Sequence, residues 1–254
     1  VVDPTTEAEC FPHALITGAP MIKRECAPDS FVFKYLVRQE ANGRNWNLTE
    51  KQFIVAHLGE EHQLGAVVGM NVVDSLTSLD EGPFALNHSG GLPFDGVIDL
   101  CMSTEDRGWV LRVLNEEGGL YGYLGLKDVP ALFANDSVQT ASIREALVYQ
   151  IAKEIGALAT VLKGQVHAII LAGELGGYEP FIQEMRQRIG YLGPISVYPE
   201  NQGLQALLAG AQRVLNQEPI RNLTQRSVLH GIRQSKAQST GWTKAEYGSG
   251  LGSR

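Results

Sequence analysis

Short apolar runs are the clearest pattern in the chain, and three of them lie between residues 51 and 75. They are rich in β-branched and aromatic residues and occupy positions 53–55, 64–68 and 72–73. Gly59 and Gly69 stand near the two reversals between them. The pattern predicts three strands joined by tight turns. From these residues alone an ordinary β-hairpin is favoured, because short strand signals are common. The alternative is a turn whose backbone amides hold a phosphate.

Apolar residues at helical spacing form a second pattern, which is strongest over residues 142–162. Ser142 and Glu145 match a capping box, and Gly164 stands where a C-terminal glycine belongs. Shorter helices are predicted at 30–43, 180–189 and 203–215.

Two further strands are predicted between these helices, at 166–171 and 195–198. The first lacks polar alternation, which predicts cover on both faces. Segments 79–93 and 121–125 are predicted as loops, while 97–102 fits either a helix or a strand. Strands that alternate with helices, after an antiparallel hairpin, predict an α/β lobe with a mixed sheet flanked by helices.

The composition is that of a globular protein, because 44% of the 254 residues are apolar and 19% are charged. A net charge of −7 argues against a nucleic-acid-binding protein. From residue 220 onward there are six Lys or Arg and one Glu. We therefore predict a basic, flexible tail over residues 218–254.

The cysteines Cys10, Cys26 and Cys101 are odd in number and far apart in sequence, without a C-x-x-C pair. They predict neither a disulfide framework nor a zinc site, and they favour a reducing cytoplasm. An apolar stretch of about 18 or more residues, as a membrane span requires, does not occur in the sequence. The sequence therefore predicts a cytoplasmic protein without a membrane partner.

Several short motifs follow one another in a fixed order. They are HLG at 57–59, EGPF at 81–84, SGGLP at 89–93, YQIAKEIGA at 149–157 and VYP at 197–199. Together they resemble the butyrate kinase branch of the acetate kinase family, from Val1 to about Gln217. This resemblance implies an actin-like ATPase (ribonuclease H-like) fold and ATP-dependent phosphorylation of a short-chain carboxylate, with ATP or ADP and Mg²⁺ as cofactors.

The resemblance also implies a domain division. Residues 1–50 would be a remnant of the first lobe and the crossover, residues 51–217 a butyrate kinase-like second lobe, and residues 218–254 the tail. Most of a first lobe would be absent, so a partner chain could supply it. The family dimerises through its second lobe, which implies a homodimer here.

Five residues of this chain match positions that have catalytic or binding roles in the family. Asp3, in the VVDP segment, matches an acidic residue with a catalytic or metal-binding role, although an Asp-Pro turn explains it equally well. His57 and Gly59 match the second phosphate loop, and Gly173 matches the nucleotide-binding turn near adenosine. His88 occupies the position of the family's catalytic arginine and lacks its fixed, permanently charged fork.

Other positions depart from the family in charge. Glu60 and Glu61 stand where the family has small residues, Glu174 replaces a second glycine, and Asp29 replaces a histidine. A carboxylate at about 4 Å from a phosphate costs about 1 kcal/mol even in bulk water. The sequence therefore favours a catalytically impaired paralogue that binds a partner or regulates.

Two alternatives remain at this point. One is an active butyrate kinase-type enzyme, completed by another lobe or chain, in which His88 stands in for the arginine. The other is an acidic pocket of Glu60, Glu61 and Glu174 that binds a cation or an amine, whereas the ordinary expectation for such carboxylates is a solvated surface.

Overall fold

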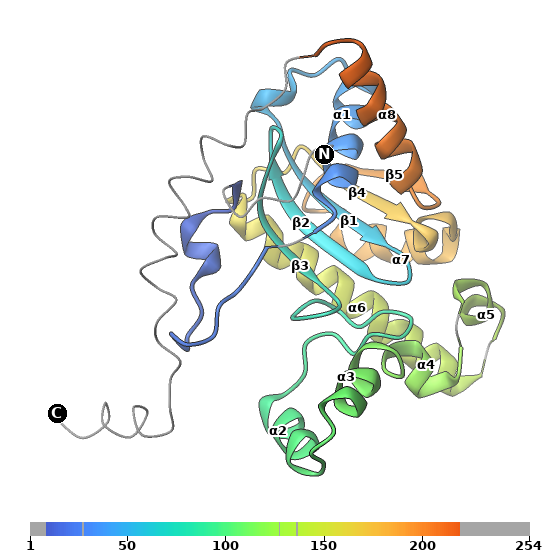
Figure 1. The fold of residues 1–254 in the computed structure, drawn as a ribbon. Coiled ribbons are helices and arrows are strands. Elements are labelled where there is room, and N and C mark those ends of the chain that lie inside the picture. The colour runs from blue at the N-terminus through green and yellow to red at the C-terminus, as the bar shows by residue number, and fades with distance from the viewer. Residues whose placement is uncertain (1–8, 27, 127, 136, 219–254) are drawn as a thin grey trace.

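A five-stranded mixed sheet forms the centre of the protein (Figure 1). The structure is a computed structural model, and it describes residues 9–218 apart from 27, 127 and 136. The strand order is β3-β2-β1-β4-β5. The strands are β1 (Gln52–Leu58), β2 (His62–Val68), β3 (Asn71–Thr77), β4 (Ala168–Gly173) and β5 (Ile195–Pro199).

The sheet is antiparallel on one side of β1 and parallel on the other. β1 pairs antiparallel with β2, which pairs antiparallel with β3. β1 also pairs parallel with β4, which pairs parallel with β5. The predicted hairpin portion and the predicted parallel part are therefore both confirmed.

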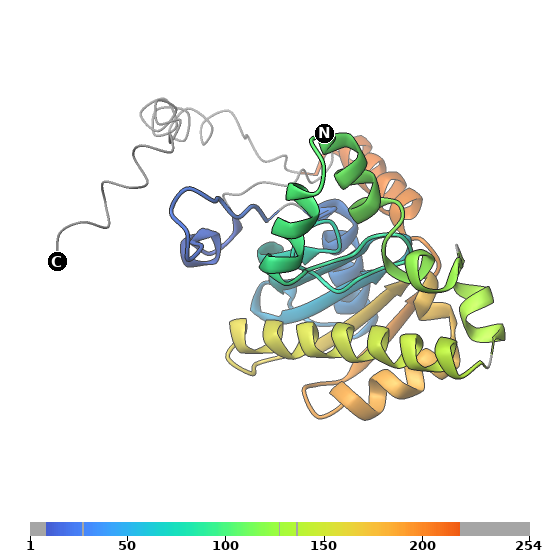
Figure 2. The same cartoon turned by 90° about the horizontal axis from the view of Figure 1, so that it is seen from below.

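Helices cover both faces of the sheet (Figures 1 and 2). α1 (Ser30–Gly43) and α8 (Gly203–Leu215) lie on one face, and their core includes Phe53 and Val55 of β1. α6 (Val138–Val161) and α7 (Glu179–Ile189) lie on the other face, with Ile54 and Ala56 in their core. Successive residues of a strand point to opposite faces, so the continuous apolar run in β1 fills both cores.

The long helix α6 begins earlier than the sequence pattern predicts. Its N-cap is Ser137, whose side chain accepts a hydrogen bond from the Thr140 amide at 3.1 Å. The predicted capping box of Ser142 and Glu145 is wrong, because these residues lie inside the helix. The predicted C-terminal glycine is correct, since Gly164 has φ +74° and its amide donates to the Ala159 carbonyl at 2.9 Å.

Four short helices fill the connection between β3 and α6. They are α2 (Phe94–Met102), α3 (Arg107–Asn115), α4 (Gly119–Leu124) and α5 (Val129–Ala134). The segment that fitted either a helix or a strand is thus helical. The loop predicted at 121–125 is wrong, because α4 continues to Leu124 and ends at Gly125 with φ +66°.

The edge strand β3 is contacted by residues near the start of the described chain. The Phe11 amide donates to the Val73 carbonyl at 2.8 Å, and a Glu9 carboxylate oxygen accepts from the Val72 amide at 3.4 Å. Glu9 also forms an ion pair with Lys34 of α1 at 2.9 Å. Residues 9–11 are therefore fixed between the sheet edge and α1.

Some predictions fall outside the described residues or stay untested. Asp3 and nearly all of the predicted tail lie outside them, and the division at residues 50 and 217 stays a prediction. Within the described residues, no helix has the length and apolar content to cross a membrane.

Candidate functional site

The candidate site lies where β1 and β4 end side by side. His57 of β1 pairs with Ala172 of β4, so the turn after His57 lies next to Gly173. A Cβ atom on Gly173 would lie 2.5 Å from the Leu58 carbonyl oxygen, and Gly173 has φ +90°. Only glycine tolerates both conditions. The sheet therefore brings three predicted residues, His57, Gly59 and Gly173, into one place.

Three imidazoles lie near this turn, close enough to influence one another electrostatically. His57 and His88 both act electrostatically on His62, the first residue of β2. His57 and His62 are buried, and His88 is half-buried. Among the described residues, neither ring nitrogen of His62 has a partner with good hydrogen-bonding geometry, nor has Nε2 of His57 or Nδ1 of His88. The predicted residue His88 therefore joins the site from the loop that precedes α2.

Burial controls the charge of all three histidines. It lowers the pKa of His57, against the opposing charge of Asp29. It lowers the pKa of His62 to about 3, although the Glu61 carbonyl opposes the shift. It also lowers the pKa of His88, against the carbonyl and the carboxylate of Glu60. Burial in a low dielectric therefore disfavours the imidazolium form of all three rings.

Carboxylates surround the same turn. Glu60 accepts a hydrogen bond from Asn87 Nδ2 at 3.5 Å, next to His88. Glu61 is half-buried, and its pKa is raised first by burial and then by the charge of Asp29. The acids that replace small or basic residues of the resembled family thus gather around His57 and Gly59.

Asp29 is held in place by a reciprocal pair of hydrogen bonds with Gln63. Its amide donates to Gln63 Oε1 at 2.7 Å, and its carboxylate accepts from Gln63 Nε2 at 3.2 Å. Asp29 is also the N-cap residue of α1. Its carboxylate is therefore fixed toward β2 and the turn.

The backbone of the turn is partly engaged with itself. The Gly59 amide donates to the Glu61 carbonyl at 3.3 Å. A Cβ atom on Gly59 would meet nothing within 4 Å, so packing within the protein does not require glycine there. Glycine at this position matters only for something that approaches the turn from outside.

The predicted acidic residue Glu174 and the predicted metal site are not connected to the three histidines by any described contact. Glu174 is exposed at the start of the short 3-10 helix Glu174–Gly177, beyond Gly173. In the part of the chain that the structure describes, no group of three or more His, Cys, Asp or Glu side chains could hold a metal ion.

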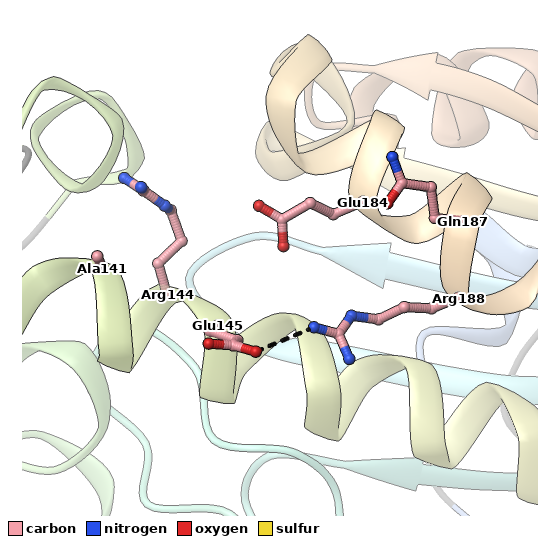
Figure 3. Close-up of a pocket in the computed structure, with 6 residues that line it drawn as sticks. All are labelled: Ala141, Arg144, Glu145, Glu184, Gln187 and Arg188. Carbon is pink, nitrogen blue, oxygen red and sulfur yellow. Dashed lines mark hydrogen bonds and ion pairs between the residues drawn. The ribbon is translucent and has the colours of Figure 1, made fainter.

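A separate cavity lies between α6 and α7 (Figure 3). Its volume is about 400 Å³, and it is lined by Ala141, Arg144, Glu145, Glu184, Gln187 and Arg188. Arg188 Nη2 lies 3.5 Å from Glu145 Oε1 across it. The sequence analysis missed this cavity, because its charges have the spacing of ordinary solvated helix faces.

His62 is the residue of the cluster that sequence reasoning missed. It follows Glu60 and Glu61 directly, so the local sequence predicts a polar turn. Only the pairing of Leu58 with His62 shows that the strand has already restarted there. The burial of this imidazole has no signal in the sequence.

The strand order and the two helix layers define an actin-like ATPase lobe. Two solved structures share this fold. A propionate kinase from Francisella tularensis subsp. tularensis is 17% identical, with a TM-score of 0.69 over 79% of this chain and 60% of that one. An acetate kinase from Entamoeba histolytica is 15% identical, with a TM-score of 0.69 over 81% of this chain and 63% of that one. The predicted fold is confirmed.

Residues 29–219 match the acetokinase family, and the chain belongs to that family. The curated "Probable butyrate kinase 2" of Caldanaerobacter subterraneus subsp. tengcongensis is 34% identical over 222 residues. That alignment covers 84% of this chain and 62% of the relative. The chain thus spans less than two thirds of this relative's length, and the predicted resemblance to a butyrate kinase is confirmed.

Proposed function

We propose that this member of the acetokinase family is a catalytically impaired paralogue that binds a partner or regulates. The observation that carries the proposal is the gathering of Asp29, Glu60 and Glu61 around the turn of His57 and Gly59. The family uses ATP and Mg²⁺, and its relatives are named as kinases of butyrate, propionate and acetate. An ATP polyphosphate would have to approach this acidic turn.

Electrostatics support impairment. Phosphoryl transfer depends on cations and donors that neutralise the transferring group. Each carboxylate at about 4 Å opposes this by about 1 kcal/mol in water and by about 4 kcal/mol at the effective dielectric of a protein surface. The raised pKa of Glu61 reports that this carboxylate already lies in an environment hostile to negative charge.

The state of His88 supports the same conclusion. Burial lowers its pKa and so disfavours the imidazolium form, which is the form that would supply a positive charge where the family has arginine. Loss of an arginine that stabilises transferring phosphate costs roughly 10³-fold or more in rate. Both features support impaired phosphoryl transfer.

The alternative is an active butyrate kinase-type enzyme that another lobe or chain completes. The specific observation in its favour is the retained approach of Gly173 to the turn of His57 and Gly59. In this version His88 stands in for the arginine, and Asp3 contributes to catalysis and to metal binding.

Two assays separate these functions. Incubation with ATP, Mg²⁺ and butyrate or acetate, with hydroxylamine to trap acyl phosphate, is expected to give no hydroxamate above the boiled control. Mg·ADP is expected to leave the thermal midpoint unchanged. A ligand at 100 times its dissociation constant stabilises by about 2.7 kcal/mol, so binding would be visible as a shift of roughly 5 to 10 °C.

A restored variant sharpens the test. Under the alternative, His88→Arg combined with Glu60→Gly and Glu61→Gly raises turnover, and a control Glu50→Gln variant, at the opposite end of β1 from the turn, does not. Turnover by the unmodified chain would overturn the proposal. No gain in the restored variant would count against the alternative.

We also propose that the chain associates with a second copy of itself. A partner chain that supplies the first lobe is a further proposal. α2 exposes Phe94, Ile98 and Met102, which are spaced so that they share one helix face. An exposed apolar face of this kind supports a second copy as the partner. Sedimentation velocity should show a dimer that Ile98→Glu shifts to monomer, and a monomer at all concentrations would refute it.

A further inference from the structure

Two cysteines that are far apart in the sequence lie side by side in the fold. Cys10 precedes Phe11, whose amide donates to the Val73 carbonyl of β3, and Sγ of Cys26 lies 3.8 Å from Oδ1 of Asp74, the next residue of β3, so that the two thiols are close enough to influence each other. Both side chains are buried and both are free thiols, whereas Cys101 on α2 is exposed. The sequence separation of Cys10 and Cys26 gave no reason to expect this contact.

The segment that carries Cys10 is fixed on the sheet edge. Phe11, the next residue, donates its amide to the Val73 carbonyl of β3 at 2.8 Å. The position of Cys10 is therefore set by strand-like pairing rather than by a free loop.

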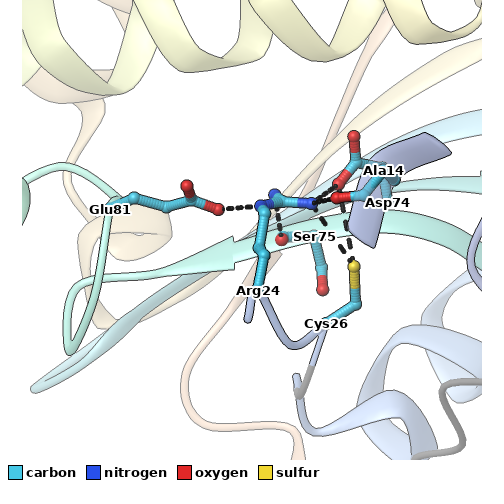
Figure 4. A network of polar contacts seen from close by, with 6 residues as sticks. All are labelled: Ala14, Arg24, Cys26, Asp74, Ser75 and Glu81. Atoms are coloured by element: carbon cyan, nitrogen blue, oxygen red, sulfur yellow. Dashed lines mark hydrogen bonds and ion pairs between the residues drawn. The ribbon is translucent and has the colours of Figure 1, made fainter. Parts of the chain in front are cut away.

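Arg24 fixes the segment that carries Cys26 (Figure 4). Its Nη1 donates to the Ala14 carbonyl at 2.7 Å and to Asp74 Oδ1 at 2.8 Å. Its Nη2 donates to the Ser75 carbonyl at 2.8 Å, and its Nε is ion-paired with Glu81. One guanidinium thus connects the segment before Cys26 to β3 and to the loop that follows β3.

The sulfur of Cys26 lies between a cationic donor, Arg24, and a carboxylate, Asp74, to whose Oδ1 the thiol donates a hydrogen bond at 3.8 Å. Arg24 Nη1 lies 3.5 Å from Sγ, and the backbone of Ser75 also hydrogen-bonds the sulfur. The interaction with Cys10 is the largest influence that lowers the pKa of Cys26, while burial and Asp74, whose Oδ1 lies 3.8 Å away, oppose it. The same contact with Cys26, followed by burial, raises the pKa of Cys10.

The contact of Arg24 with Cys26 gives the two thiols different roles. A thiolate is the nucleophile in cysteine chemistry, and a neighbouring thiol can resolve the product. Cys26 has the cationic and hydrogen-bonding partners of a nucleophile, and Cys10 is the thiol within reach.

We propose that Cys10 and Cys26 form a redox-active dithiol, which closes to a disulfide when it meets a hydroperoxide. The Cys26 thiolate attacks one peroxide oxygen, the O–O bond breaks, and Cys26 becomes a sulfenic acid while the hydroxide takes a proton to form water. Cys10 then loses its proton and attacks the Cys26 sulfur, and hydroxide leaves with that proton as water. Two thiols and one hydrogen peroxide give one disulfide and two waters.

Formation of the disulfide would change both the stability of the protein and the surroundings of Arg24. The disulfide ties residue 10 to residue 26 and removes conformational entropy from the unfolded chain. The thermal midpoint of the oxidised protein is therefore expected to rise by roughly 5 to 10 °C. Arg24 loses an anionic neighbour at the same time and keeps its bonds to Asp74 and Ser75.

The test uses the full chain, reduced and then exposed to hydrogen peroxide. Peptide mapping without reductant is expected to find Cys10 linked to Cys26, with two of three thiols lost together. Cys101→Ser is the matched control and is expected to form the same link. In Cys10→Ser, Cys26 is expected to stop at the sulfenic acid, which dimedone traps.

Two results would overturn the proposal. One is oxidation confined to Cys101, with intermolecular dimers and no link between Cys10 and Cys26. The other is a link that forms no faster in the folded chain than in urea, because the fold would then contribute nothing. Cys10→Ala, compared with Cys10→Ser, shows whether a polar replacement alone alters the dimedone yield at Cys26.

Discussion

The burial of His62 makes a quantitative prediction about acid stability. Burial lowers the pKa of His62 from 6.5 to about 3, while the unfolded chain keeps the ordinary value. The unfolded state therefore binds more protons at any pH between these values. The stabilisation is fully present above about pH 6.5 and is lost as the pH falls toward 3.

The size of the effect follows from this shift. Each pKa unit corresponds to about 1.4 kcal/mol, so a fall from pH 6.5 to pH 5.0 costs about 2 kcal/mol through His62 alone. His57 and His88 add losses of the same sign, because burial lowers the pKa of each. In His62→Leu the first contribution disappears and the other two remain.

Urea unfolding at pH 7.5, 6.0 and 5.0, followed by tryptophan fluorescence and circular dichroism, measures these losses. The free energy of unfolding of the wild type is expected to fall by about 2 kcal/mol more than that of His62→Leu between pH 7.5 and 5.0. His13→Leu, which changes an exposed imidazole, is the matched control and is expected to behave as the wild type. Equal losses in the wild type and His62→Leu would refute the reasoning.

Two further predictions concern local backbone structure. Gly173→Ala places a Cβ 2.5 Å from the Leu58 carbonyl at φ +90°, so urea unfolding should show a loss of about 2 kcal/mol or more. Gly59→Ala, whose Cβ meets nothing within 4 Å, should lose far less, and equal losses would contradict the steric explanation. Ser137→Ala removes the N-cap of α6 and should cost about 1 kcal/mol in the same measurement. Ser142→Ala, inside the helix, should change stability little, and the reverse order of these two serines would refute the observed helix start.

The sequence predicted secondary structure best where the apolar pattern was strong. The predicted helix over residues 30–43 coincides with α1, because its apolar face is regular and Asn42-Gly43 ends it. The start of α6 was missed because Ser142 and Glu145 have the spacing of a capping box, while the actual cap, Ser137, follows short polar residues that give no periodic signal.

The candidate site was predictable only in part. His57, Gly59 and Gly173 came from matching motifs, and the structure places them together because β1 and β4 are parallel neighbours. Periodicity gives the strands but not their order, so it could not bring His88 to His62. Asp3 lies outside the described residues, and its assigned role stays a prediction.

The segment that contains Glu9 and Phe11 protects the edge strand β3 from pairing with strands of other molecules. An exposed edge strand offers unpaired backbone groups to any passing strand and invites aggregation or domain swapping. Here the Val72 amide and the Val73 carbonyl of β3 are already occupied from within the same chain. Loosening of that segment would therefore turn a shielded border of the sheet into a template for intermolecular β-pairing.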